Sequence, residues 1–281
     1  MTKSAVRIDR LLLAAAVFPA LLEAETAAEI MARVAANQDR AVEARRSFVY
    51  EQTVLTRMHR FNGRLAREEK SEFLVAPATG RFEKKLVRFA GKYEREGRIV
   101  EYSQPHHEYK DTDIDGDVIS DLTDDLTAEA DSRDGIAQDL FPLTAERQAK
   151  YDFRLEGRET YRGSEVYRIR FQPRKGEGAA AWSGEALVDA REYQPVMVTT
   201  KLAHRIPMWA RTVLGTDVKQ LGFALGYRKF DDGVWFPVSY GGEFEVKAVF
   251  FYKRRISISL ANANFRRTDV ASAISYDETA K

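Results

Sequence analysis

Apolar and polar residues alternate with a period of two along much of the second half of the chain. In the clearest case, residues 165–171, Tyr167, Ile169 and Phe171 fall on one face and the arginines between them fall on the other. The same alternation recurs in residues 196–200, 244–250 and 256–260. Consecutive half-buried strands joined by short turns predict a large antiparallel sheet whose apolar face must be covered or closed on itself.

A helix is expected before the strands. Thr26 and Glu29 have the spacing of a capping box, in which each residue satisfies a backbone N–H of the other. Apolar residues between Ile30 and Ala41 fall near one face of a helix that runs to about residue 44. This helix has an apolar stripe to bury.

A strand-like segment then opens at Phe48 and Tyr50, and the clearest turn signal of the chain follows it. Asn62 and Gly63 lie next to each other between apolar residues. A two-residue hairpin turn needs positive φ at both central positions, and this dipeptide tolerates it. The elements together predict a mainly β chain with some helix.

The first 24 residues have the order of an export signal. Lys3, Arg7 and Arg10 precede an apolar run from Leu11 to Leu22, and the small residue Ala24 closes it. The run is shorter than the ~20 residues that a membrane-spanning helix needs. We therefore expect cleavage after Ala24 and a soluble single domain, residues 25–281, in the periplasm. A membrane anchor or a buried first helix is the alternative.

The amino-acid composition excludes several kinds of functional site. The chain has no cysteine, which excludes disulfides, thiolate metal sites, thiol nucleophiles and a lipid-bearing N-terminal cysteine. Removing residues 1–24 takes three basic and two acidic side chains from totals of 44 and 43, so 41 of each remain. A protein with zero net charge has no overall electrostatic attraction to nucleic acid or anionic lipid, so we expect no nucleic-acid partner.

Two segments interrupt the expected strands. The first lies near residues 106–150 and is strongly acidic, with eleven acidic and two basic residues between Glu108 and Asp134. It predicts a solvated loop or a polar insertion that carries a helix. The second, near residues 205–226, is apolar with few charges and predicts a core helix or a lid.

Few residues suggest a catalytic or metal-binding site, because the chain lacks the common motifs of nucleophilic hydrolases, zinc proteases and nucleotide-binding proteins. His106, His107 and Glu108 do not have the spacing of shared metal ligands. The acidic segment matches the first half of a calcium loop at Asp111, Asp113, Asp115 and Asp117, with Gly116 at the sharp turn. Leu122 replaces the bidentate glutamate, so Asp121 or Asp124 would have to complete a weak calcium site.

Several short segments resemble the periplasmic lipoprotein carrier LolA and its relatives. The best match is Glu96–Pro105, with a polar residue, glycine, a basic residue, an aromatic strand and then proline. Phe73–Pro77, Gly163–Phe171 and the strand pair 185–202, with Val188-Asp189 and Gln194-Pro195 at its turn, are also similar. The order of these features covers roughly residues 26–260.

The resemblance implies an incomplete antiparallel half-barrel with helices on its concave face and a cavity for acyl chains. Ala76 stands where the carrier has an arginine that helps to close the cavity. The function it implies is non-catalytic transport of lipoprotein or other envelope-lipid acyl chains toward the outer membrane, with membrane transport proteins as further partners. The candidate contacts, each of which could instead be ordinary sheet core, are Phe48, Tyr50, Tyr102, Tyr167, Ile169, Phe171, Phe244, Val246 and Phe250.

Two other classes of function stay open at this point. One is a periplasmic sensor or regulatory module of the same fold that recognises a membrane-protein partner. The other is a hydrolase that uses paired carboxylates, although no spacing of the acidic residues supports it.

Overall fold

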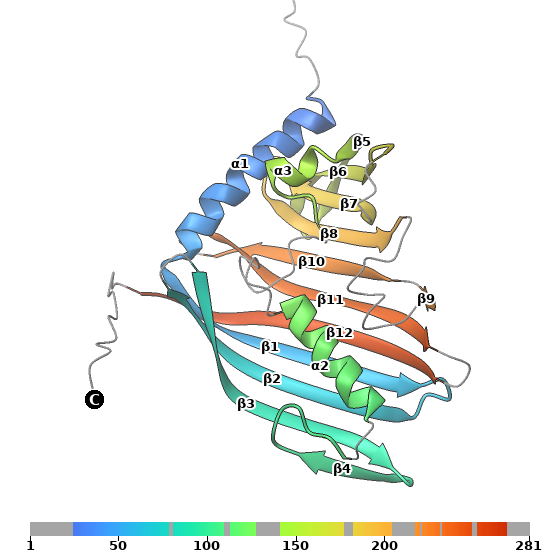
Figure 1. Ribbon diagram of the computed structural model, residues 1–281. Coiled ribbons are helices and arrows are strands. Elements are labelled where there is room, and N and C mark those ends of the chain that lie inside the picture. Colours follow the sequence, from blue (N-terminus) through green and yellow to red (C-terminus); the bar gives the residue numbers. More distant parts are fainter. Residues whose placement is uncertain are drawn as a thin grey trace, which may run out of the picture.

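The computed structural model describes residues 25–78, 81–109, 113–127, 141–176, 182–203, 217–219, 221–230, 232–248 and 252–268. These residues form mainly β-structure with few helices (Figure 1). The strands are β1 (Phe48–Arg60), β2 (Leu65–Ala78), β3 (Arg81–Arg95), β4 (Arg98–Tyr102), β5 (Tyr151–Tyr161), β6 (Ser164–Pro173), β7 (Trp182–Asp189), β8 (Pro195–Leu202), β9 (Asp217–Lys219), β10 (Gly222–Lys229), β11 (Trp235–Ala248) and β12 (Tyr252–Arg267). The helices are α1 (Ala27–Arg45), α2 (Ile114–Thr127) and α3 (Ala145–Gln148).

The strands form one curved antiparallel sheet built from two meanders. The strand order is β4-β3-β2-β1-β12-β11-β10-β8-β7-β6-β5, and β9 pairs with β11 off this path. The first meander ends at the edge strand β4, and the second begins at the opposite edge with β5 and returns until β12 pairs with β1. The predicted half-barrel, an unclosed antiparallel sheet with helices over one face, is confirmed.

One face of the sheet is apolar from the first meander to the second. A row of directly paired residues on this face crosses seven strands, and it comprises Val54, Leu260, Tyr240, Leu225, Val198, Ala186 and Ile169. All seven are buried in one core cluster. Burying a Val, Leu or Ile side chain of this row contributes roughly 1.5–3 kcal/mol relative to an exposed position, so burial of this face is a major part of the stability.

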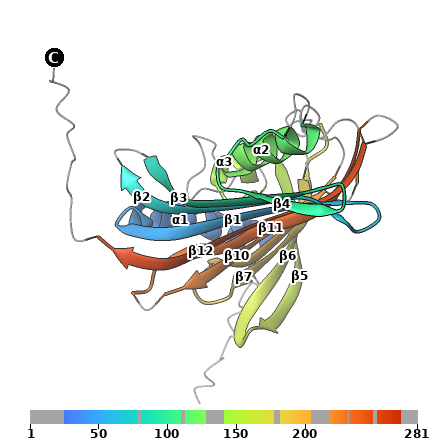
Figure 2. The ribbon, with the colours of Figure 1, turned by 90° about the horizontal axis from the view of Figure 1, so that it is seen from below.

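The helices cover this apolar face, which we call the covered face. Helix α1 packs against β5 and β11, and α2 packs against β1 and β2 (Figures 1 and 2). Ile30 and Val34 of α1 and Ile119 and Leu122 of α2 belong to the same core cluster as the sheet. Within the described part of the chain, no helix combines the length and the apolar character needed to cross a membrane.

The start of α1 matches its sequence signal. Thr26 caps the helix, and its side chain and that of Glu29 each bond the other's backbone N–H, as the capping box predicted. The preceding residue, Glu25, accepts hydrogen bonds from the Tyr167 hydroxyl at 2.8 Å and the Tyr193 hydroxyl at 2.9 Å. These bonds fix the beginning of α1 to the second meander.

The Asn62-Gly63 turn joins β1 to β2, but its geometry differs from the prediction. Gly63 has φ of 82°, whereas Asn62 does not take positive φ. The N–H of Arg60 bonds the Arg64 carbonyl, and the N–H of Gly63 bonds the Arg60 carbonyl, both at 2.9 Å. The loop therefore has three residues, 61–63, with glycine in the left-handed position. The expectation of two positive φ values is wrong, and the predicted hairpin is confirmed.

The two predicted insertions have different structures. The described part of the acidic segment forms α2 and α3 between the two edge strands. In the apolar segment, residues 204–216 lie outside the described residues, while 217–219 and 222–226 belong to β9 and β10. The end of that segment is therefore sheet.

Candidate functional site: a pocket between β2, β3 and α2

Strand β2 places an arginine on the covered face. The Arg67 side chain is 1% exposed. Its Nε donates to Glu69 Oε1 at 2.9 Å and to the Tyr102 oxygen at 2.8 Å. Its Nη1 and Nη2 donate to the Asp113 carboxylate and to the His107 carbonyl. One guanidinium thus joins β2 to β4, to the loop after β4 and to the start of α2.

Tyr102 completes this buried polar group. Its hydroxyl donates to Glu69 Oε1 at 2.6 Å. Burial, and next the negative charge of Glu69, raise the pKa of Tyr102 well above its ordinary value, so it stays a protonated donor. The ring fits because its neighbour is Gly91, where a Cβ would lie 2.1 Å from the ring. The ring also stacks on His107, with ring centres 4.6 Å apart.

The alternating aspartates begin α2. Asp113 acts as its N-terminal cap, since its Oδ1 accepts from the Gly116 N–H at 3.1 Å. Asp115 forms a bidentate ion pair with Arg254 of β12, at 2.8 and 3.0 Å. Together with the Arg67 contact, these pairs attach the first turn of α2 to strands from both meanders.

Two of the four predicted calcium ligands, Asp113 and Asp115, already bind arginine side chains. Of the other two, Asp117 is exposed and Asp111 lies outside the described residues. Over the described ranges, no three histidine or acidic side chains gather closely enough to hold a metal ion. Weak calcium binding remains a prediction that calorimetry with millimolar calcium tests.

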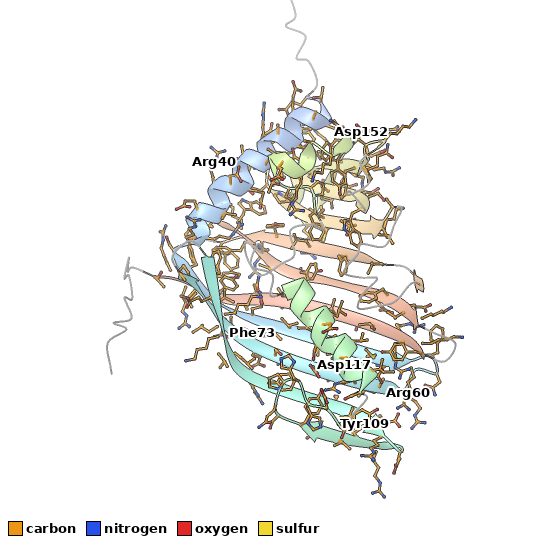
Figure 3. The ribbon with its side chains drawn as sticks, in the orientation of Figure 1. Arg40, Arg60, Phe73, Tyr109, Asp117 and Asp152 are labelled. Carbon is orange, nitrogen blue, oxygen red and sulfur yellow. The ribbon has the colours of Figure 1, made fainter. Side chains whose placement is uncertain are left out.

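A pocket of about 310 Å³ lies beside this polar group, between β2, β3, the loop after β4 and α2. Its volume falls at the lower end of the range of ligand pockets. The apolar lining residues are Phe73, Leu86, Phe89 and Pro105, and the polar ones are Glu69, Ser71, Lys84, His106, Ser120 and Thr123. In Figure 3, the labels Phe73 and Asp117 mark the two elements that flank it, β2 and α2.

Lys84 of β3 lines this pocket next to an aromatic ring. Its Nζ lies 5.9 Å from the centre of the Phe73 ring. Burial lowers the pKa of Lys84 to about 8, because the charged ammonium is partly removed from water. The other strong charge of the pocket, Glu69, is bonded by Arg67 and Tyr102.

A wider hollow of about 510 Å³ lies over β6, β7 and β8, beside Gly184. A Cβ at Gly184 would lie 1.8 Å from the Thr199 carbonyl oxygen, so this close approach of backbones needs glycine. Apart from Phe171 and Gly184, its lining side chains are polar or charged, with Arg170, Glu185 and Lys201 among them. An acyl chain fits this lining less well than that of the pocket under α2.

The predicted ligand contacts fall into three places. Tyr167, Ile169, Phe171, Phe244 and Val246 lie in the core cluster under the helices. Phe48 and Tyr50 form an aromatic group with Phe236 and Phe265, with ring centres 4.9 and 5.2 Å apart for the pairs Phe48–Phe236 and Tyr50–Phe265. Tyr102 lies in the Arg67 group, and Phe250 lies outside the described residues.

None of the residues that line the pocket under α2 is among the ligand contacts predicted from the sequence. Phe73, Leu86 and Phe89 come from β2 and β3, whose sequences contain many charged residues and no regular alternation of apolar and polar positions. The register shift between Glu72 and Phe73 explains this, because a bulge changes which residues of β3 share a face. The sequence gives no signal of that shift.

No protein-family model matches the sequence, and no curated protein matches it. Among solved structures, the chain is similar to a DUF1329 family protein from Desulfovibrio piger (12% identity, TM-score 0.40, covering 89% of this chain and 96% of that one). It is also similar to a putative outer membrane lipoprotein-sorting protein domain from Vibrio parahaemolyticus (12% identity, TM-score 0.38, covering 84% of this chain and 92% of that one). A third similar structure is a LolA superfamily protein from Nitrosomonas europaea (12% identity, TM-score 0.32, covering 88% of this chain and 96% of that one). The second and third of these structures bear the family names that the sequence segments resemble.

Proposed function

We propose that this chain is a non-catalytic periplasmic module that binds an acyl chain of an envelope lipid or lipoprotein in the pocket under α2. The observation that carries the proposal is the pocket itself, with aromatic and aliphatic side chains from β2, β3 and the loop after β4. Apolar surface of this kind gains from removing a hydrocarbon chain from water. Transport toward the outer membrane is the role that we infer for such a module.

Helix α2, which forms one side of the pocket, is attached to the sheet at its first turn. Asp113 holds it to β2, and Asp115 holds it to β12. A hydrogen bond of 3.1 Å between the hydroxyls of Thr56 and Thr123 holds α2 to β1 farther along the helix, and an entering chain that displaces this part of α2 must break it. We infer that the Arg67 contact keeps the first turn of α2 in place while cargo enters.

Substitutions at two neighbouring residues of α2, one inside the pocket and one outside it, test where the ligand binds. Ser120 lines the pocket, and Asp121 is exposed. Ser120→Phe should fill the pocket and weaken the binding of a fluorescent fatty acid by about tenfold or more, whereas Asp121→Phe should leave it unchanged. Equal affinities for the two variants and the wild type would contradict the pocket as the binding site.

Export is part of the proposal and has its own test. Residues 1–24 lie outside the described residues, and the described chain begins at Glu25. The intact mass of protein recovered from the periplasm of an exporting host should correspond to a chain that starts at Glu25. Recovery of a periplasmic chain that still carries Met1 or Thr2 would refute the processing site.

A partner-binding module is a second candidate, and the edge of the sheet favours it. Among the described residues, strand β4 pairs only with residues 91–95 of β3. In the described structure, residues 81–90 of β3 pair with β2 alone, and Leu86 and Val87 are exposed there at 40% and 67%. An exposed edge strand can accept a strand from another chain. Protection of amides 82–89 from hydrogen exchange in a cell-envelope extract, but not with fatty acid, would favour this function.

A further inference from the structure

Three hairpins turn side by side at one end of the sheet. Strands β1, β3 and β11 run in the same direction, so the turns β1–β2, β3–β4 and β11–β12 lie at the same end (Figure 1). The label Arg60 marks this end in Figure 3. We call it the basic end and define it as residues 60–64, 95–99, 247–248 and 252–255. Eight of these residues are lysine or arginine, and one is acidic.

Neighbouring carboxylates do not balance the charge of the basic end. Four of them, from outside it, form ion pairs with its arginines, namely Glu94, Asp115, Glu243 and Glu245. With the one acid inside it, eight cations face five carboxylates, so three positive charges are in excess. Arg98 and Lys253 are exposed, and neither forms an ion pair with another residue of the described ranges.

Like charges also face each other across the strands of the basic end. Lys247 lies directly opposite Lys253, and Arg95 lies directly opposite Arg98. Such pairs repel each other and destabilise an antiparallel sheet. Because the repulsion occurs in two separate hairpins, a layer of anions that extends over both would relieve it, whereas a single bound anion would relieve only one.

Apolar side chains are exposed among these cations. Phe61 in the β1–β2 turn is 49% exposed, and Ile99 of β4 is 53% exposed. The Nζ of Lys247 lies 5.7 Å from the centre of the Phe61 ring, so a cation of one hairpin and the aromatic ring of the next form one surface. Basic side chains next to exposed aromatic and aliphatic ones are typical of surfaces that bind the headgroup region of anionic bilayers.

We propose that the basic end docks this protein on the surface of an anionic phospholipid bilayer, with its cations next to the lipid phosphates and Phe61 in the headgroup region. The docking surface is separate from the acyl pocket and adds a membrane contact to the proposed function. Arg254 belongs to the basic end and pairs with Asp115 in the first turn of α2. Docking therefore brings the helix that covers the pocket close to the bilayer.

Co-sedimentation with lipid vesicles tests the docking. Wild type should bind vesicles of equimolar phosphatidylcholine and phosphatidylglycerol about tenfold or more tightly than vesicles of phosphatidylcholine alone, and added salt should weaken the binding. The double variant Arg98→Gln, Lys253→Gln should bind the anionic vesicles about fivefold more weakly for each charge removed. Its melting temperature should not fall, because both changes remove a like-charge pair. Phe61→Ser should also weaken the binding.

Two controls separate docking from net charge and from the acyl pocket. Arg162 follows β5 and Arg228 lies near the end of β10; both are exposed, and these strands end at the opposite end of the sheet. Arg162→Gln, Arg228→Gln changes the net charge equally and should bind anionic vesicles like wild type. Ser120→Phe, which fills the pocket, should also bind them like wild type.

The outcomes separate docking from the proposed acyl-binding function. If wild type binds neutral and anionic vesicles alike, or binds neither, the docking proposal is wrong and the acyl pocket is unaffected. If the control pair of arginines weakens binding as much as Arg98→Gln, Lys253→Gln, net charge alone causes the binding and the proposal also fails. Loss of vesicle binding in Ser120→Phe would mean that the pocket holds the lipid, and would likewise overturn docking through the basic end.

Discussion

Arg67 of β2 donates to the carboxylate of Asp113, the residue that caps α2, and both side chains are almost fully removed from solvent. Through this contact the guanidinium connects the first meander to the helix that covers it. The close approach explains Gly116, where a Cβ would lie 2.6 Å from Arg67 Nη1. The position of α2, and with it the pocket, depends on this pair.

Breaking the pair should destabilise the protein strongly. Arg67→Met leaves the buried Asp113 carboxylate without its guanidinium, and loss of one partner of a buried pair costs about 3–5 kcal/mol. Urea unfolding measures this cost. The matched control is Arg57→Met, which breaks the half-exposed ion pair of Arg57 with Glu68 and should cost less than about 1 kcal/mol. Similar costs for both variants would refute a special role of the buried arginine.

Gly91 should not tolerate a methyl group. In Gly91→Ala, the Cβ would lie 2.1 Å from the Tyr102 ring, so the ring must move away from Glu69 and Arg67. Overpacking of this kind costs about 1–3 kcal/mol, and thermal or urea unfolding should show it. The double variant Gly91→Ala, Tyr102→Leu relieves the clash and should lose less than the sum of the two single changes. Additive losses would mean that the ring does not depend on Gly91.

Ile169 should behave as packed core. It is 0% exposed and lies in the row of paired residues under the helices. Ile169→Ala should lower the free energy of unfolding by about 2–5 kcal/mol, because it removes buried carbon and leaves a cavity. As a control, Val87→Ala at a 67% exposed position should change it by less than about 0.5 kcal/mol. A small cost at Ile169 would instead indicate that this residue lines an open cavity.

Stability at acidic pH should depend on Glu25. The hydrogen bond from Tyr167 has the largest effect on the pKa of Glu25 and lowers it, whereas burial, the next largest, raises it. The bond from Tyr193 and the charge of Arg33 lower it further, so the pKa of Glu25 lies below its ordinary value of 4.5. The resulting stability is fully present above pH 4.5 and is lost as the pH falls through the lower folded-state pKa. Glu25→Gln should flatten this part of the curve of melting temperature against pH. A curve that keeps its slope in Glu25→Gln would show that other carboxylates cause it.

The sheet could be predicted from the sequence because its signal is local. Strand β6 shows it best, since Tyr167, Ile169 and Phe171 alternate with arginines and all three are buried in the structure. The capping box of α1 is also local, with partners three residues apart. For both elements, side-chain periodicity within a few residues is sufficient.

The pocket could not be predicted because its parts are distant in the sequence. Arg67 contacts Tyr102 and Asp113, which are 35 and 46 residues away, and within β2 it looks like one of several exposed charges. Its burial depends on those partners, and local patterns carry no information about them. The aromatic alternation of β6 and β11 likewise could not distinguish a filled core from a cavity wall.

Locating the bound acyl chain tests most directly whether it lies in the pocket under α2. A photoactivatable fatty acid should be crosslinked to the wild-type protein and the labelled peptides identified by mass spectrometry. We expect labels near four residues that line the pocket under α2, Phe73, Leu86, Phe89 and Thr123, and loss of these labels in Ser120→Phe. Labels confined to residues 167–171 and 244–246, or scattered over the surface without competition by unlabelled fatty acid, would contradict it.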